Sequence, residues 1–238
     1  MRFDIPRDRM LEVAETDIVF DSAPHPYEVE HAEAIEANWQ GEAALNPALF
    51  DGKVMLFSRL AWRAGKLDAS CHAVRFATYL YWRRTRASAT AEHLYSHAVP
   101  VTSVGALVTV RMGAHTANAG RVYFAAGSLD LDDVRDRRVD IAHNMVREVR
   151  EETGIDLSGC RRDAAYHGYS SNGGTVIVRR YYLAEPADVV ERRIRHFIAA
   201  ESDPEIAEAV IVRGDHDLPD GLAAHMPPLI AWHFGAGR

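Results

Sequence analysis

Apolar positions near the start of the chain recur with the period of a helix. Val29, Ala32, Ile35 and Trp39 are spaced by three or four residues, so they would share one face of a helix over residues 27–44. The Asn-Pro pair that follows ends this helix, because the residue before a proline avoids the helical conformation. The segment is therefore predicted to pack through one apolar stripe.

Later segments alternate between strand-like runs and helical spacing. Runs rich in β-branched and aromatic residues predict strands over residues 17–20, 53–64, 67–75, 101–111, 121–125, 164–170, 175–183 and 209–213. Helical spacing predicts helices over 141–153 and 187–200 and around Pro227, whereas the aromatic run 76–84 fits either a strand or a helix. This alternation indicates a mixed α/β fold, with an N-terminal α/β extension over residues 1–98 and a second domain over residues 99–238.

The predicted helix over residues 141–153 has recognisable ends. Asp140 stands where an N-cap residue would accept a backbone N–H, and Gly154 can adopt the left-handed conformation that stops a helix. The preceding residues, 128–138, are rich in aspartate and are predicted to form a loop.

Composition narrows the class of partner. The chain has 27 basic and 34 acidic residues and a net charge of −7, which does not favour bulk binding to nucleic acid. Cys71 and Cys160 are too few for a disulfide framework or a zinc site, so reduced thiols in a cytoplasmic protein are expected. The apolar runs are too short to span a membrane, and the charged N-terminus is unlike a secretory signal. The 12 histidines lack the spacing of metal ligands.

Three glutamates cluster at the end of the predicted helix over residues 141–153. Glu148, Glu151 and Glu152 are related by three and four positions, so we expect them on one helix face. Their mutual repulsion and the helix dipole both disfavour this arrangement. A bound Mg²⁺ or Mn²⁺ would compensate, because hard cations prefer carboxylate oxygens. A solvated acidic face is the alternative that the three residues alone leave open.

The residues around these glutamates make the pattern more specific. Arg147 lies four positions before Glu151 and can pair with it, while Val149 and Ile155 are apolar where the helix must pack. The string Arg-Glu-apolar-x-Glu-Glu-x-Gly-apolar resembles the second half of the Nudix box, and the resemblance extends over residues 99–234. It implies a Nudix α/β/α sandwich with a mixed sheet, preceded by the N-terminal α/β extension.

The resemblance also implies roles for individual residues. Glu151 and Glu152 would be the core ligands of Mg²⁺ or Mn²⁺, and Glu148 would be a further ligand or the base. Arg147 would orient these carboxylates, and Gly127 would line the metal site with its backbone carbonyl. The reaction would be the attack of water on a phosphorus atom of a diphosphate.

The first half of the box departs from the family pattern. Its glycine would fall at Asp133 and its glutamate at Val139, which indicates an insertion of about six residues after Gly127. Asp136 or Asp140 could substitute for the missing glutamate, although capping the helix is the simpler role for Asp140. A binding module that senses a nucleotide without turnover therefore stays open beside an active hydrolase.

Several further residues are candidates for contacting the substrate. They are Arg179, with Arg180 as its neighbour on the opposite strand face, and His115 and Asn118 in a loop. In related enzymes a base can come from a loop beyond the box, where this chain has Glu201, Glu205 and Glu208.

The N-terminal region is similar to that of the UDP-glucose/UDP-galactose diphosphatases of the Nudix group. The similarity is carried by residues 31–39 and by residues 46–53, and a generic helix and turn would explain both segments equally well. The resemblance implies a small nucleoside diphosphate derivative as substrate, with ADP-ribose and coenzyme A as alternatives to a nucleotide sugar. It also implies a homodimer as an assembly, whereas the absence of nucleic-acid and membrane partners is expected from the net charge and the short apolar runs.

Overall fold

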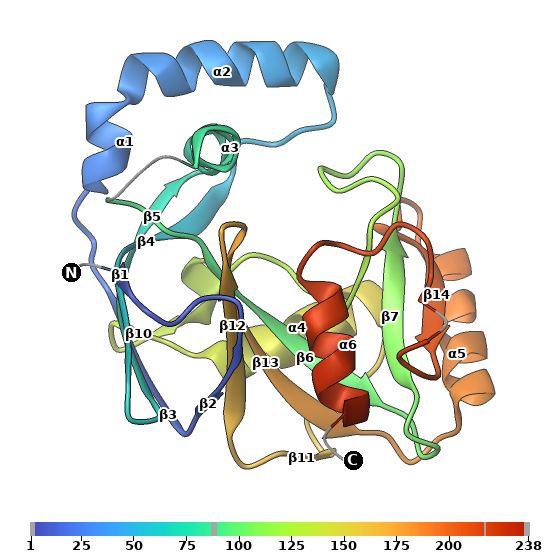
Figure 1. Ribbon diagram of the computed structural model, residues 1–238. Coiled ribbons are helices and arrows are strands. Elements are labelled where there is room, and N and C mark those ends of the chain that lie inside the picture. The colour runs from blue at the N-terminus through green and yellow to red at the C-terminus, as the bar shows by residue number, and fades with distance from the viewer. Residues whose placement is uncertain (1–2, 87–89, 217, 236–238) are drawn as a thin grey trace. The chain divides into compact units, whose positions relative to one another are not determined.

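Helices and strands alternate along the chain, and the predicted mixed α/β fold class is confirmed (Figure 1). The computed structural model describes residues 3–86, 90–216 and 218–235. Contacts between residues divide the chain into two units. Unit 1 comprises Met1–Tyr95, Ser128–Ile141 and His167–Ile177, and unit 2 comprises Ser96–Gly127, Ala142–Tyr166 and Val178–Arg238. Residues 128–141 and 167–177 belong to unit 1, so the two units do not follow the predicted boundary at residue 99. A second domain over residues 99–238 stays a prediction.

Unit 1 contains a six-stranded mixed sheet. Its strands are β1 (Phe3–Asp4), β3 (Glu15–Phe20), β4 (Lys53–Arg63), β5 (Lys66–Arg75), β9 (Val134–Arg135) and β10 (Arg138–Val139). They lie in the order β1-β4-β5-β3-β10-β9. The pairs β1–β4 and β3–β5 are parallel, and β4–β5 is an antiparallel hairpin. Two further strands, β2 (Met10–Val13) and β12 (Tyr166–Ser171), pair with each other.

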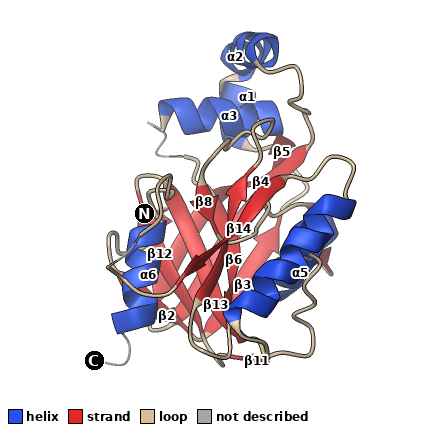
Figure 2. Ribbon diagram, turned by 90° about the vertical axis from the view of Figure 1, so that its right-hand side faces the viewer, coloured by secondary structure: helices blue, strands red, loops and turns tan. Residues whose placement is uncertain are grey.

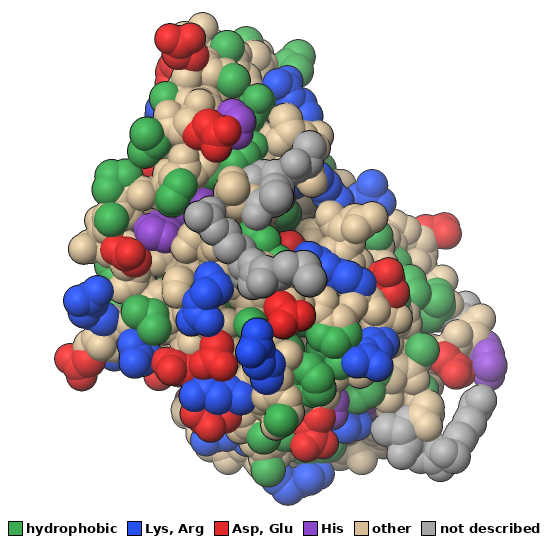
Figure 3. Space-filling view, turned by 60° about the vertical axis from the view of Figure 1, so that its left-hand side comes forward, with side chains coloured by type: hydrophobic (Ala, Val, Ile, Leu, Met, Phe, Trp, Pro, Cys, Tyr) green, Lys and Arg blue, Asp and Glu red, His purple; other side chains and the backbone are tan. Residues whose placement is uncertain are grey.

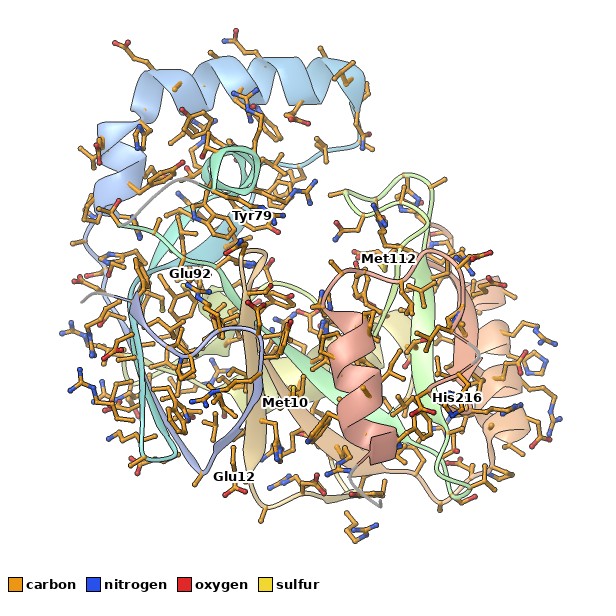
Figure 4. All side chains as sticks on the ribbon, in the orientation of Figure 1. Met10, Glu12, Tyr79, Glu92, Met112 and His216 are labelled. Carbon is orange, nitrogen blue, oxygen red and sulfur yellow. The ribbon has the colours of Figure 1, made fainter. Side chains whose placement is uncertain are left out.

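The α-helices of unit 1 among the described residues are α1 (Pro26–Glu30), α2 (Ala32–Leu45) and α3 (Phe76–Thr85). The prediction of one helix over residues 27–44 was wrong in one respect, because His31 leaves the helical conformation and separates α1 from α2. The ambiguous aromatic run forms α3. Its Trp82 is buried with Tyr27 and with apolar residues of β4 and β5. Tyr79, labelled in Figure 4, packs against the same cluster.

The aspartate-rich segment is more ordered than a loop. Residues Leu131–Asp133 form a short 3-10 helix, and β9 and β10 follow as a tight hairpin whose β10 pairs with β3. The turn uses Asp136 and Arg137 with φ values of 47° and 61°. Asp133 is fully buried and accepts the backbone N–H of Asp130 at 3.1 Å, while Val139 is buried in β10. Asp133 and Val139, the two positions that depart from the Nudix pattern, therefore stabilise the inserted segment.

Unit 2 is built on four adjacent strands in the order β14-β7-β6-β13. These strands are β6 (Leu94–Val101), β7 (Leu107–Met112), β13 (Gly174–Tyr182) and β14 (Ile206–Val212), with the first residues of β6 and β13 assigned to unit 1. Two short strands pair with them, β8 (Val122–Tyr123) with β7 and β11 (Arg161–Arg162) with β13. The prediction of one strand over residues 101–111 was wrong, because Gly105 (φ +81°) helps turn the chain between β6 and β7.

The helices of unit 2 are α4 (Ile141–Thr153), α5 (Ala187–Ala200) and α6 (Met226–Gly235). Gly154 ends α4 as predicted, with φ +69° and its N–H bonded to the Arg150 carbonyl at 2.9 Å. Helix α5 packs against β14 (Figure 2). Among the described residues, none of the helices combines the length and the apolar character that crossing a membrane requires. On the face shown in Figure 3, acidic and basic side chains are interspersed.

Candidate functional site

A row of polar residues lies on the inner face of α4. Asn144, Glu148 and Glu152 are four positions apart, so they stack along one side of the helix. Asn144 is fully buried and Glu148 is 8% exposed, whereas Met145 and Val149 form the adjoining apolar stripe. The sequence thus places charge in the interior of unit 2.

The expectation that all three glutamates share one face is only partly correct. The side chain of Glu151 is 59% exposed, whereas that of Glu148 is 10% exposed. At about 100° per residue, Glu151 and Glu152 lie on opposite sides of Glu148 around the helix axis. The edge of the packed interior falls between Glu148 and Glu151, so Glu148 and Glu152 point inward and Glu151 points outward.

Arg147 joins two of these carboxylates. Its guanidinium lies 2.9 Å from Glu148 Oε1 and 3.1 Å from Glu151 Oε2, which confirms the predicted pair with Glu151. Because the Arg147 side chain is only 18% exposed, these ion pairs are partly shielded from solvent. Arg147 can therefore orient both carboxylates.

Gly127, in the loop after β8, lies directly against Glu148. A Cβ atom at this position would overlap the Glu148 carboxylate and force it to move, so glycine leaves room for the carboxylate where it lies. The structure thus brings Gly127 and Glu148 together, as the sequence pattern predicts for two residues of one site.

Glu152 is the most perturbed acid of the cluster. Its Oε2 atom is buried and has no hydrogen-bond partner among the described residues. The pKa of Glu152 is raised to about 8, mainly by burial and also by the nearby carboxylates of Glu148 and Glu205, while the Ala126 N–H opposes the shift. Charge on this carboxylate is therefore costly unless a cation neutralises it.

The fit to a divalent cation rests on two of the predicted ligands. Within residues 3–86, 90–216 and 218–235, no three His, Cys, Asp or Glu side chains form a ready-made metal cluster. Glu148 and Glu152 nevertheless supply hard oxygen atoms, and the Glu152 Oε2 atom lacks a partner. A cation that keeps several water ligands, as Mg²⁺ does, needs only one or two carboxylates. The residues present therefore fit such an ion, with Glu151 at the edge of the site.

Sequence reasoning missed two residues beside Glu148. Ser96 Oγ donates a hydrogen bond of 2.5 Å to Asn144 Oδ1, and Asn144 Nδ2 lies 3.4 Å from Glu148 Oε1. Asn144 could have been noticed, because it precedes Glu148 by four positions on the same helix. Ser96 could not, because it lies on β6, far away in the sequence.

The predicted substrate-contacting arginine is occupied within the protein. Arg179 is 5% exposed, donates to the Tyr181 hydroxyl at 2.7 Å and lies 4.2 Å from the centre of the Tyr166 ring. Its neighbour Arg180 pairs with Asp163 at 2.7 Å. Neither guanidinium is therefore arranged as an exposed phosphate contact.

The other predicted contacts lie in the loop after β7. His115 lies 3.7 Å from Asp203, and Asn118 donates to the Tyr123 hydroxyl at 3.2 Å. Among the three late glutamates, Glu208 pairs with Arg111 at 2.8 Å and Glu201 is an exposed residue at the end of α5. Glu205 is the one whose charge acts on Glu152.

An open hollow of about 520 Å³ lies on the outer side of α4. Its lining includes His143, Arg147, Arg150 and Glu151, and Phe197 of α5. Two guanidinium groups and an exposed carboxylate therefore meet in a space large enough for part of a small-molecule ligand.

No protein-family model and no curated protein matches the chain significantly. Solved structures do match. A MutT protein from Methanosarcina mazei Go1 is 17% identical, with a TM-score of 0.40, over 61% of this chain and 95% of that one. A protein from Deinococcus radiodurans is 11% identical, with a TM-score of 0.43, over 60% of this chain and 83% of that one. Because these TM-scores are low, no property of those proteins is assigned to this chain. The candidate site is described from its own residues alone.

Proposed function

We propose that this chain is a Nudix-type hydrolase that uses Mg²⁺ or Mn²⁺ to cleave the diphosphate of a nucleoside diphosphate linked to another group. The observation that carries the proposal is that Glu148 and the Oε2 atom of Glu152 are buried on one face of α4, with Gly127 fitted against Glu148. Buried like charges lower stability, and packing alone does not require them. A functional cation explains why this sequence keeps them.

In this proposal the chain's own residues bind and orient the reactants. Glu148 and Glu152 would hold the cation, with Glu151 at the edge of the site and Arg147 fixing the Glu148 and Glu151 carboxylates. When bound, the cation would neutralise phosphate charge and activate water. Arg150, which lines the hollow beside Glu151, would attract the anionic substrate. Glu148 and Glu151 are the candidates for accepting the proton of the attacking water.

The proposed substrate class rests on the resemblance of the N-terminal region. The segment that resembles the UDP-sugar diphosphatases forms α2 and the turn that leads into β4. We therefore place nucleotide sugars first, with ADP-ribose and coenzyme A as alternatives. A homodimer is part of the same proposal.

The test is hydrolysis of a substrate panel by the full chain with Mg²⁺. UDP-sugars, ADP-ribose, NADH and coenzyme A would be offered, and release of phosphate monoesters measured. We expect turnover of at least one compound, and loss of turnover in Glu152→Gln with the fold intact. If none of the compounds gives a product, the enzyme proposal is wrong. An unaltered rate in Glu152→Gln would rule out the ligand role of Glu152.

A second candidate is a nucleotide-binding module without turnover. It is favoured by the altered first half of the box, where Asp133 and Val139 support an inserted hairpin. In the same panel this module would bind a nucleotide, as measured by calorimetry, and release no product.

A further inference from the structure

A buried chain of hydrogen bonds runs from β6 to the candidate site. Ser96 and Asn144 are both fully buried, and their bond of 2.5 Å is followed by the 3.4 Å approach of Asn144 Nδ2 to Glu148 Oε1. All three residues belong to unit 2. These hydrogen bonds thus connect strand β6 to the Glu148 carboxylate.

The chemistry of the groups fixes the direction of this chain. A carboxylate only accepts hydrogen bonds, so Asn144 must present its NH₂ group to Glu148. The amide oxygen then faces Ser96, whose hydroxyl can donate to it. Ser96 therefore donates to Asn144, and Asn144 donates to Glu148. A reversed Asn144 amide would place its oxygen against the Glu148 carboxylate, and both groups are acceptors.

The two donors converge on the same carboxylate oxygen. Arg147 reaches Glu148 Oε1 at 2.9 Å, and Asn144 reaches the same atom within the interior. Both oxygens of this carboxylate lie against the position that a Cβ on Gly127 would take. Contacts from Arg147, Asn144 and Gly127 thus define the rotamer of Glu148.

Packing and helix formation do not explain an asparagine here. Asparagine is a poorer helix former than alanine or leucine, and a buried amide is unfavourable unless both of its ends are bonded. Asn144 is the fourth residue of α4, and its amide meets a serine on one side and an acid of the candidate site on the other.

We propose that Asn144, held by Ser96, is a positioning residue that fixes the Glu148 carboxylate for cation binding. The proposal rests on the proposed function, because it takes Glu148 as a ligand. It goes beyond the Nudix resemblance, which assigns no role to Asn144 or Ser96. Residues that orient a metal ligand act through hydrogen bonds, and their loss weakens metal binding by about 10- to 100-fold.

The test measures binding of Mn²⁺ to the full chain by calorimetry, without substrate. Asn144→Ala is expected to weaken binding at least about tenfold, and Ser96→Ala to weaken it less. Because Ser96 acts through Asn144, the double variant should bind as weakly as Asn144→Ala alone. The milder Ser96→Ala variant keeps the test valid if Asn144→Ala does not fold.

Two controls separate positioning from general damage to the fold. Thr109→Val removes a buried hydroxyl of unit 2 whose bond of 2.6 Å goes to the Val210 carbonyl, and Asn38→Ala removes a buried amide from α2. Both should retain Mn²⁺ affinity. Equal affinity in wild type, Asn144→Ala and Ser96→Ala overturns the inference and leaves the proposed function standing. Equal weakening in Thr109→Val also overturns it, and a wild type that binds no Mn²⁺ overturns the proposed function and this inference together.

Discussion

Helices α4 and α5 are almost equal in length, with 13 and 14 residues, yet they bury different chemistry. The buried residues of α5 are Ala187, Val190 and Ile194, all of them apolar. Its charges lie outside, where Arg192 pairs with Asp188 and Arg195 pairs with Glu191. In α4, by contrast, an amide and two carboxylates share the inner face with apolar residues.

The two helices therefore differ in where their charges lie, exposed to water on α5 and partly buried on the inner face of α4. The exposed pairs of α5 cost little and stabilise little, because water screens them. On the inner face of α4, burial is the main cause that raises the pKa of Glu152 to about 8. The ionised form of Glu152 is therefore unfavourable when no cation is present. A helix that needed only to pack would resemble α5, and the departure of α4 from that pattern supports the proposal that α4 carries the site.

The largest effect is expected from Gly127→Ala, which removes the space beside α4. The new Cβ would overlap the end of the Glu148 side chain, which can rotate away. We therefore expect Mn²⁺ affinity to fall by about 10- to 100-fold, comparable to the loss of an orienting contact, while unfolding free energy falls by only about 1 kcal/mol. Calorimetry and denaturant unfolding measure the two quantities.

Gly159→Ala is the matched control, because a Cβ there would meet nothing within 4 Å. It should change neither quantity by much. Retention of wild-type Mn²⁺ affinity by Gly127→Ala would contradict the assigned contact between Gly127 and Glu148.

A smaller effect is expected in the stability of the metal-free protein as a function of pH. The folded pKa of Glu152 is raised from 4.5 to about 8, so the folded state holds this proton more tightly than the unfolded state. Stability is therefore unaffected by this group below about pH 4.5 and falls as the pH rises toward 8. Glu152→Gln removes this loss and should be more stable than wild type by about 1 kcal/mol or more above pH 8, and equal to it near pH 4.

Denaturant unfolding at several pH values, with a chelator present, measures this difference. Glu191→Gln on the exposed face of α5 is the control and should run parallel to wild type. A Glu152→Gln variant that also ran parallel to wild type would mean that Glu152 is hydrated in the folded protein.

Local patterns predicted much of this comparison. The bounds of α4 and α5, the stop at Gly154 and the Arg147–Glu151 pair all depend on residues within a few positions of one another. Their spacing alone therefore determines them.

The remaining features depend on contacts between distant residues. Whether Glu151 or Glu152 faces inward depends on what packs against α4, and the Ser96–Asn144 bond joins residues 48 positions apart. The inserted segment was mistaken for a loop because β10 pairs with β3, which lies near the start of the chain. The split of the predicted strand over residues 101–111 was missed because its β-branched residues continue through the turn at Gly105.

The smallest effect is expected from Arg192→Ala on the outer face of α5. Arg192 lies 3.2 Å from Asp188, and the two side chains are 57% and 65% exposed, so the pair should contribute only about 0.3–0.5 kcal/mol. Arg147→Ala on α4 should cost more, about 1–3 kcal/mol, because it removes a donor from the buried Glu148 carboxylate. Denaturant unfolding in low and high salt distinguishes them, since salt should abolish the small loss and leave most of the larger one. Equal losses in the two variants would mean that α4 carries its charges as α5 does, and the contrast between the helices would no longer indicate a site.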